Sequence, residues 1–172
     1  MSVNEEVQEH SHHAQEPFDK KVAATMAIIA ALLAVVSVSG HIFTTEELLH
    51  QQQASDQWSY SQAKDIRHYT AQAAHDELGA IKADAALAAR YDADSKRYKS
   101  ETNEIQEKAR ELEKESHGDG RKALRLHFGE VFLEVAIVLS SLAILSKRTL
   151  LWMAGVISSV VGIALALTSF FV

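Results

Sequence analysis

Three side chains capable of acid–base chemistry stand close together in an otherwise apolar stretch. His127, Glu130 and Glu134 are three and four residues apart, so on a helix they share one face. A carboxylate in hydrocarbon must be paired, hydrated or protonated. These residues could therefore hold a proton or a cation.

Polar residues of an earlier apolar stretch, Ser37, Ser39 and His41, reach a similar depth if both stretches cross a bilayer. Three interpretations remain open: a membrane boundary at which the glutamates face water, a structural hydrogen-bonded lock, and a proton or cation path. The lock predicts that Glu134 turns toward Ser37 and His41 in the outer third of the membrane. It places Glu130 nearer to water and His127.

The remaining histidines are weaker candidates for metal binding. His10, His12 and His13 form an isolated His-rich segment, while His68 and His75 are two turns apart, too far to share an ion without a partner helix. The chain contains no HExxH motif, nucleophile elbow or glycine-rich phosphate loop. We therefore predict no catalytic residue, no metal site and no cofactor, and a protein that is not an enzyme.

Charge is segregated along the 172 residues. Residues 1–19 contain five acids and no Lys or Arg, whereas residues 41–125 hold 16 of the 23 acids and 13 of the 17 basic residues. Such alternation indicates two solvents, water and lipid. The net charge of -6 argues against a nucleic-acid partner. No cysteine is present, which excludes disulfides and thiolate chemistry.

Three stretches are predicted to cross a membrane as helices: residues 20–43, 124–146 and 150–172. A hydrocarbon core of about 30 Å needs roughly 20 helical residues, which each stretch supplies. A cleaved signal peptide is the alternative for the first, because small residues follow its apolar run. Residues 1–19 are expected to be a disordered acidic tail, and residues 147–149 a basic cytoplasmic turn.

The basic residues that flank the spans predict the orientation. Lys20 and Lys21 precede the first span, and Lys147 and Arg148 precede the third. Both pairs place the N-terminus in the cytoplasm, with the central block and the C-terminus outside. The group Arg121, Lys122 and Arg125 beside the second span argues for the opposite orientation.

Residues 44–123 are predicted to form an extramembrane antiparallel helical hairpin, because they contain no proline and are rich in good helix formers. The turn is expected near Gly79, which makes Ile66 and Ala93 neighbours, or alternatively near the sequence YDADSK. Gly118 and Gly120 are expected to break the second helix before the bilayer. The predicted fold is therefore all-α, with three transmembrane helices and this hairpin between the first two.

A seven-residue repeat on the second arm indicates a thin coiled-coil seam, for which an exposed helix with chance spacing is the alternative. The repeat is interrupted by Ser95 and Thr102. It consists of Tyr91, Tyr98, Ile105 and Leu112, with Ala88 and Ala109 between. A weaker stripe on the first arm contains Ala63, Ile66, Thr70, Ala73 or Ala74, and Ile81.

Small residues at spacings of four suggest close helix packing in the membrane, within one chain or between copies. They are Ala154, Ser158, Gly162 and Ala166 in the last span, and Ala23, Ala27 and Ala31 in the first. An aromatic segment of the central block is either a recognition patch or packing between arms or copies. This candidate interaction segment contains Trp58, Tyr60, Gln62, Lys64 and Tyr69.

The central block contains a characteristic segment with Asp56, Gln57, Trp58, Tyr60, Gln62, Ala63 and Lys64. Through this segment the chain resembles a family of small bacterial membrane proteins known as domain of unknown function 4337, and the resemblance covers most of the chain. Ser61 stands where the pattern has a second aromatic residue. The resemblance implies a multi-pass protein of the bacterial cytoplasmic (inner) membrane and implies no reaction.

Two functions are consistent with these features. The first is a membrane-anchored coiled-coil interaction or scaffold protein that self-associates or binds a protein partner through the hairpin. The alternative is a small proton- or cation-conducting, or transport-accessory, membrane subunit that uses the Glu/His cluster. Both have the lipid bilayer as a partner.

Overall fold

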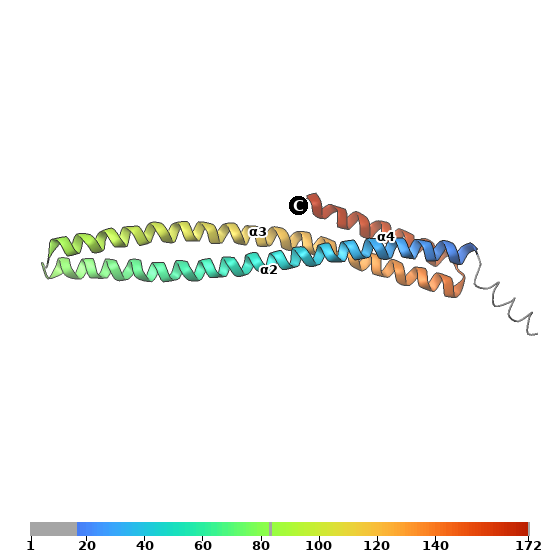
Figure 1. Ribbon diagram of the computed structural model, residues 1–172, viewed down its shortest axis with the longest axis horizontal. Helices are drawn as coiled ribbons and strands as arrows, with labels where there is room; N and C mark the ends of the chain where they lie inside the picture. The colour runs from blue at the N-terminus through green and yellow to red at the C-terminus, as the bar shows by residue number, and fades with distance from the viewer. Residues whose placement is uncertain (1–16, 83, 172) are drawn as a thin grey trace, which may run out of the picture. The chain divides into compact units, whose positions relative to one another are not determined.

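The computed structural model describes residues 17–82 and 84–171. In this part of the chain the fold is all-α, with the three long helices α2 (Pro17–Ala80), α3 (Ala85–Ser146) and α4 (Thr149–Thr168), followed by the short 3-10 helix η1 (Ser169–Phe171). Figure 1 shows these elements in chain order. Most of the predicted acidic tail, together with His10, His12 and His13, lies outside the described residues.

Two of the expected helix boundaries are wrong. The predicted tail ends before residue 19, because α2 already begins at Pro17. Proline fits the first turn of a helix, and the negative charge of Asp19 in that turn interacts favourably with the positive end of the helix dipole. Gly118 and Gly120 do not break α3, which continues through both of them. Glycine weakens a helix by only about 1 kcal/mol relative to alanine, which good helix formers on either side offset.

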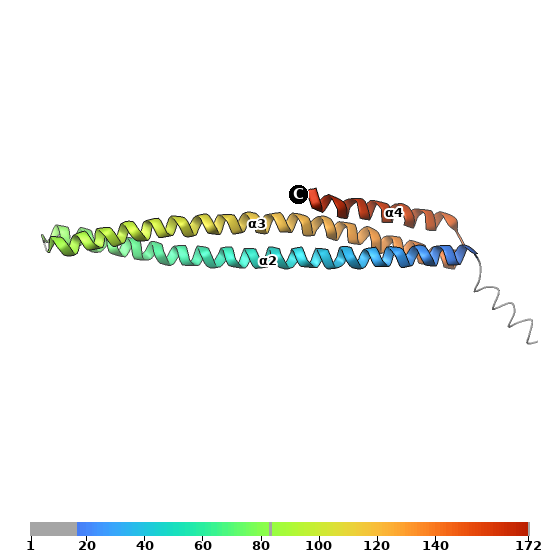
Figure 2. The ribbon, with the colours of Figure 1, turned by 45° about the horizontal axis from the view of Figure 1, so that its top comes forward.

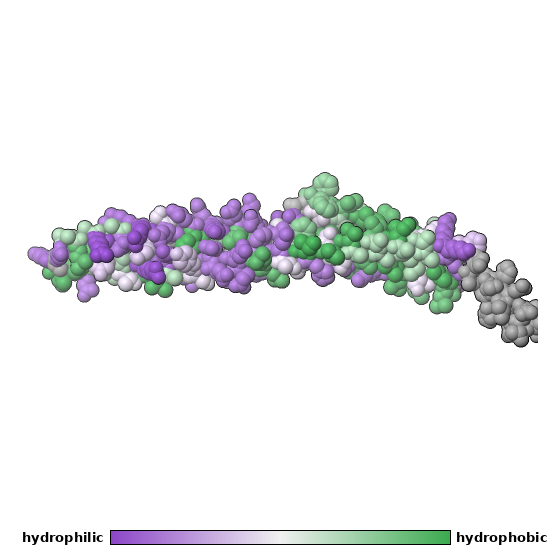
Figure 3. Space-filling view, viewed as in Figure 1, coloured by the Kyte–Doolittle hydropathy of each residue, from purple (hydrophilic) through white to green (hydrophobic). Residues whose placement is uncertain are grey.

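The chain divides into two compact units, of which unit 1 contains residues 1–44 and 120–172 and unit 2 contains residues 45–119. Among the described residues, three helices are long and apolar enough to cross a membrane, and they are α2, α3 and the segment from Thr149 to Phe171. In the face drawn in Figure 3, hydrophobic residues gather over unit 1 and hydrophilic residues over unit 2. This segregation is typical of a membrane protein.

A small apolar core holds unit 1 together. Ile29 of α2 packs against Leu133 and Ala136 of α3, and half-buried side chains surround them, including Ile163 of α4. An ion pair closes one end of the unit, where Lys147 Nζ lies 2.6 Å from Asp19 Oδ2. At the other end the guanidinium Nη1 of Arg125 donates to the Thr168 carbonyl at 2.7 Å, which caps the C-terminus of α4.

Glycines bring α3 and α4 into backbone contact. A Cβ placed on Gly129 would lie 2.8 Å from the Gly162 carbonyl oxygen, and one placed on Gly155 would lie 2.8 Å from Ser140 Oγ. The buried residues of α4 are Gly155, Ser159, Gly162 and Ala166, so the predicted stripe matches the buried series at its last two positions. Ser158 of the stripe is half-buried and also contacts α3, because its hydroxyl donates to the Phe132 carbonyl at 2.8 Å. Alternate spacings of four and three stay on one helix face, whereas repeated spacings of four drift around it.

In the first span, Ala23, Ala27 and Ala31 are exposed. They therefore do not provide close helix packing within the chain.

In unit 2, segments 45–80 of α2 and 85–119 of α3 lie side by side (Figures 1 and 2). The series Ser95, Thr102, Ala109 and Ser116 is buried at every seventh residue of α3. The expected repeat of Tyr91, Tyr98, Ile105 and Leu112 is half-buried beside it. The two residues regarded as interruptions, Ser95 and Thr102, are therefore part of the contact.

The chain leaves α2 just beyond Gly79. Gly79 is still helical, and Lys82 adopts a left-handed conformation with φ 52°. The expected neighbours Ile66 and Ala93 are both exposed, and His68 instead contacts Ser95. The weak stripe predicted for the first arm, which includes Ile66 and Ile81, faces outward.

Candidate functional site

The predicted polar cluster exists in unit 1, with Glu130 at its centre. Nδ1 of His127 lies 3.1 Å from Glu130 Oε2, and Ser37 lies beside the same carboxylate. The His41 ring contacts the His127 ring edge-on, with the centroids 5.9 Å apart. Four of the five predicted residues are therefore brought together, from α2 and α3.

Thr44, which sequence reasoning missed, completes the cluster. Its hydroxyl lies 3.1 Å from Nε2 of His127 and donates to the Gly40 carbonyl at 3.0 Å. His127 packs closely over Gly40, where a Cβ would lie 3.2 Å from Cε1 of the ring. Its position could have been predicted from the sequence, because Thr44 lies four residues after Gly40 and three after His41 and therefore shares their helix face.

A chain of hydrogen bonds runs through this cluster. Nδ1–H of His127 can donate to the Glu130 carboxylate, which as an ionised group only accepts. Nε2 faces the Thr44 hydroxyl, which has one proton to give, either to Nε2 or to the Gly40 carbonyl. The tautomer of His127 therefore sets the direction of the bond to Thr44.

Glu134 is not part of the cluster, and the predicted lock at this residue is wrong. Its side chain is exposed and makes no hydrogen bond or ion pair with any described residue. Glu130, expected nearer to water, is instead the half-buried carboxylate, with 18% of its side chain exposed. Ser39 also stays outside the cluster and donates to the Val35 carbonyl of its own helix.

The register of α3 explains this exchange of roles. Glu130 lies seven residues after Ala123, which continues the buried series of Ser116 and Ala123. Glu134 follows the fully buried Leu133 by one residue, which turns it about 100° away from the contact. The seven-residue repeat of buried positions on α3 therefore predicts which glutamate is buried, whereas the spacings of three and four from His127 do not.

The contact between α2 and α3 in unit 2 is polar. Lys64 forms an ion pair with Glu101, which holds the pKa of Glu101 below its ordinary value of 4.5 and the pKa of Lys64 above 10.5. His50 Nδ1 lies 3.0 Å from Asp119 Oδ2. Burial of such groups is tolerated because each of them has a hydrogen-bond partner.

His68 and His75 also serve the contact between α2 and α3. Nδ1 of His75 lies 2.9 Å from the Ala88 carbonyl, and Nδ1 of His68 lies 3.0 Å from the Ser95 carbonyl. Among the described residues, no group of three or more His, Asp and Glu side chains could hold a metal ion. These histidines act as hydrogen-bonding groups in this structure.

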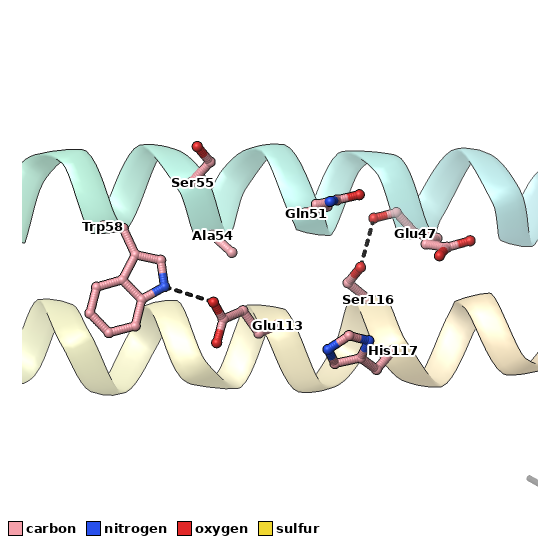
Figure 4. Close-up of a pocket in the computed structure, with 8 residues that line it drawn as sticks. All are labelled: Glu47, Gln51, Ala54, Ser55, Trp58, Glu113, Ser116 and His117. Carbon is pink, nitrogen blue, oxygen red and sulfur yellow. Dashed lines mark hydrogen bonds between the residues drawn. The ribbon is translucent and has the colours of Figure 1, made fainter.

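A shallow groove of about 430 Å³ lies along unit 2 (Figure 4). The Trp58 indole N–H donates to Glu113 Oε1 at 2.8 Å, and the Ser116 hydroxyl donates to the Glu47 carbonyl at 3.1 Å. Ala54 lies between these two contacts, and its small side chain leaves the groove open. The groove therefore forms where a small residue lies in the contact between α2 and α3.

The candidate interaction segment divides between two faces of α2. Trp58 and Lys64 contact α3, as described above. Tyr69 is 62% exposed, and Gln62 is exposed on the same side of the helix. Tyr60 is 52% exposed and lies at the edge of the contact, with its ring centroid 5.4 Å from Lys64 Nζ. Ile66, which lies between Tyr60 and Tyr69 in the sequence, is 67% exposed.

The family of the chain follows from the comparison with known families. The fold defines a helical protein in which, among the described residues, three helices are long and apolar enough to cross a membrane. A family model described as domain of unknown function (DUF4337) matches residues 18–172, and the chain belongs to this family. Neither the curated proteins nor the solved structures contain a match.

Proposed function

We propose that this protein is a membrane-anchored scaffold, in which three transmembrane helices hold an antiparallel coiled-coil hairpin outside the bilayer, and that it self-associates through the hairpin. One observation carries the proposal. The contact between α2 and α3 in unit 2 uses small and polar residues, whereas Ile66 and Tyr69 of α2, about 60° apart around the helix, remain exposed.

Tyr60 lies about half a turn around the helix from Tyr69, with its ring centroid 5.4 Å from Lys64 Nζ, and is not part of this surface. Exposed aromatic and aliphatic groups that gather on one segment are typical of protein contacts. Ile66 lies two residues from both Lys64 and His68, which places it about 200° around the helix from the contact with α3. The outward face of α2 is therefore the proposed surface for a second copy.

Crosslinking in native membranes tests self-association. The chain has no cysteine, so Ile66→Cys introduces a single thiol on the proposed surface. We expect oxidation or a short bis-maleimide to give a discrete dimer band. The matched control, Asn103→Cys, places a thiol on an exposed position of α3 and is expected to give none.

If Ile66→Cys and Asn103→Cys, each expressed at the native level, both gave only a monomer band after crosslinking, the proposal would be contradicted.

We further propose that the N-terminus and the turn between α3 and α4 face the cytoplasm of a bacterial cell, with unit 2 outside. The ion pair of Asp19 and Lys147 puts Lys20, Lys21 and Arg148 near the same end of unit 1. The group Arg121, Lys122 and Arg125 argues for the opposite orientation, and the two basic pairs Lys20–Lys21 and Lys147–Arg148 outweigh it.

Thiol labelling tests this orientation. Ser95→Cys is buried, so the adjacent exposed position Lys96→Cys is the better probe, with Thr149→Cys for the other side. A membrane-impermeant reagent should label Lys96→Cys in intact spheroplasts and should label Thr149→Cys only after lysis. The reverse pattern would contradict the proposed orientation.

A proton- or cation-conducting subunit is the second candidate, and the hydrogen-bonded chain of Thr44, His127 and Glu130 favours it. The apolar core of Ile29, Leu133 and Ala136 lies beyond the cluster along the same helices, which favours a local polar lock over a complete path. Proton flux into liposomes tests it. A flux that falls with Glu130→Gln and persists with Glu134→Gln would establish conduction.

A further inference from the structure

An apolar groove of about 180 Å³ opens on unit 1 where α2, α3 and α4 meet. Its α2 side runs from Leu32 to Ser39, about 10 Å of helix. Leu126 of α3 and Ile163 of α4 form its other sides, and Phe170, 76% exposed, stands at its edge. The only hydroxyl that lines it among the described residues belongs to Ser39, which is bonded within its own helix.

A guanidinium stands at one end of this groove. Arg125 precedes the lining residue Leu126, and its Nη1 donates to Thr168, which follows the lining residue Leu167. That bond uses one of the five N–H donors of the guanidinium. Arg121 is exposed one turn earlier on the same helix, so both cations can face one anionic group.

We propose that this groove binds an anionic glycerophospholipid, with part of one acyl chain along Leu32 and Val35 and the phosphate at Arg125 and Arg121. The proposal rests on the proposed insertion of unit 1 into a membrane. Two observations select the occupant: the lining is apolar over a length suited to an extended hydrocarbon chain, and the charge at its end is complementary to a phosphate. The groove is narrow and has basic residues at one end, which matches a lipid with an anionic headgroup at one end of its acyl chain.

The groove also explains why α2 and α4 are not fully packed against each other at this end. Ala166 is buried and contacts Gly129 of α3, and this close approach of α4 to α3 leaves the side facing α2 open. A lipid chain would fill this space without displacing any bonded polar group. It would link the last turn of α4 to the first span.

Native mass spectrometry of the full chain, released from vesicles that contain equal amounts of phosphatidylglycerol and phosphatidylcholine, tests the proposal. We expect bound phosphatidylglycerol in excess over phosphatidylcholine. Arg125→Gln should lower the retained phosphatidylglycerol by about fivefold, the effect expected for one basic residue at an anionic surface. Arg148→Gln, at the other end of unit 1, is the control for general charge.

A second pair of variants tests the apolar part. Val35→Phe should fill the groove and reduce lipid retention, whereas Val38→Phe should not, because Val38 is similarly exposed and does not line the groove. Neither position belongs to the core of unit 1, so both variants should fold. Equal retention of the two lipids, or equal retention by the two valine variants, would overturn the proposal.

Two further outcomes separate this inference from the proposals on which it rests. Vesicle flotation reports insertion independently: a chain that floats with both lipids and shows no lipid preference refutes the groove and leaves the membrane anchor intact. A chain that does not float refutes the anchor itself. If Val35→Phe converts a dimer mass into a monomer mass with unchanged lipid, the groove binds a second copy and the lipid proposal falls.

Discussion

The backbones of Gly129 and Gly162 touch: a Cβ on Gly162 would lie 2.7 Å from the Gly129 carbonyl oxygen, and the reciprocal distance is 2.8 Å. No side chain fits between them at this separation. Such close approach is how apolar helices gain van der Waals contact in lipid, where the hydrophobic effect does not drive helix association.

Gly162→Val should therefore separate α4 from α3 and destabilise unit 1 by about 1–3 kcal/mol, the usual cost of overpacking. Thermal unfolding in detergent, followed by circular dichroism, measures the loss. Gly118→Ala is the matched control, because nothing lies within 4 Å of its added methyl group. It should stabilise α3 by about 0.5–1 kcal/mol, and a loss of stability there would contradict the helical account of residues 118–120.

The two glutamates of α3 should differ in their response to substitution. Glu134→Leu should leave the stability nearly unchanged or raise it, because the side chain is exposed and has no described partner. Glu130→Leu should lower stability, because it leaves the half-buried His127 without an acceptor. Equal losses from both variants, measured by unfolding in the same detergent, would refute the assigned roles.

The hydrogen bond between His127 and Glu130 has a spectroscopic signature. In the wild type, ¹⁵N NMR of His127 should show a proton on Nδ1, because this nitrogen faces a carboxylate. Glu130→Leu should remove this preference, whereas Glu134→Leu, which changes an exposed side chain, should keep it. A wild-type ring with its only proton on Nε2 would contradict the hydrogen-bond assignment.

The Lys64–Glu101 pair predicts a pH window for unit 2. The lowered pKa of Glu101 stabilises the fold above its ordinary value of 4.5, and this contribution is lost as the pH falls through the folded pKa. The raised pKa of Lys64 stabilises the fold below its ordinary value of 10.5, and this contribution is lost as the pH rises through the folded pKa. The pair therefore contributes fully between these two values.

Hydrogen exchange at the amides of residues 61–71 in the full chain measures this contribution. Glu101→Gln should speed exchange at neutral pH and should match the wild type in strong acid. The control Glu104→Gln removes an exposed carboxylate of the same helix and should change little at any pH. A difference between wild type and Glu101→Gln that persists in strong acid would show that the effect is not electrostatic.

The end of α2 offers a stabilising substitution. Lys82 has φ 52°, a left-handed conformation that favours glycine over residues with a Cβ. Lys82→Gly should raise the free energy of unfolding by a few tenths to about 1 kcal/mol. Gly79→Ala, inside the helix and with open space around its Cβ, should stabilise as well, whereas a turn centred on Gly79 would make it destabilising.

The sequence by itself determined the helical class and the three apolar helices. Both follow from local properties. Residues 44–115 contain no helix breaker except Gly79, and apolar runs of about 20 residues alternate with charged stretches along the chain. The family likeness is equally local, since it rests on a contiguous segment around Trp58. The polar cluster could be named in advance because polar residues are conspicuous in apolar stretches.

Only the tertiary structure decided which members of each pattern face one another. Glu130 and Glu134 share a helix side in sequence, yet the register set by Ala123 and Leu133 buries one and exposes the other. Ser95 and Thr102 read as interruptions, yet they occupy the contact because two closely packed helices accept small side chains there. These choices depend on how the neighbouring helix is aligned, and the residue pattern of one helix does not specify that alignment.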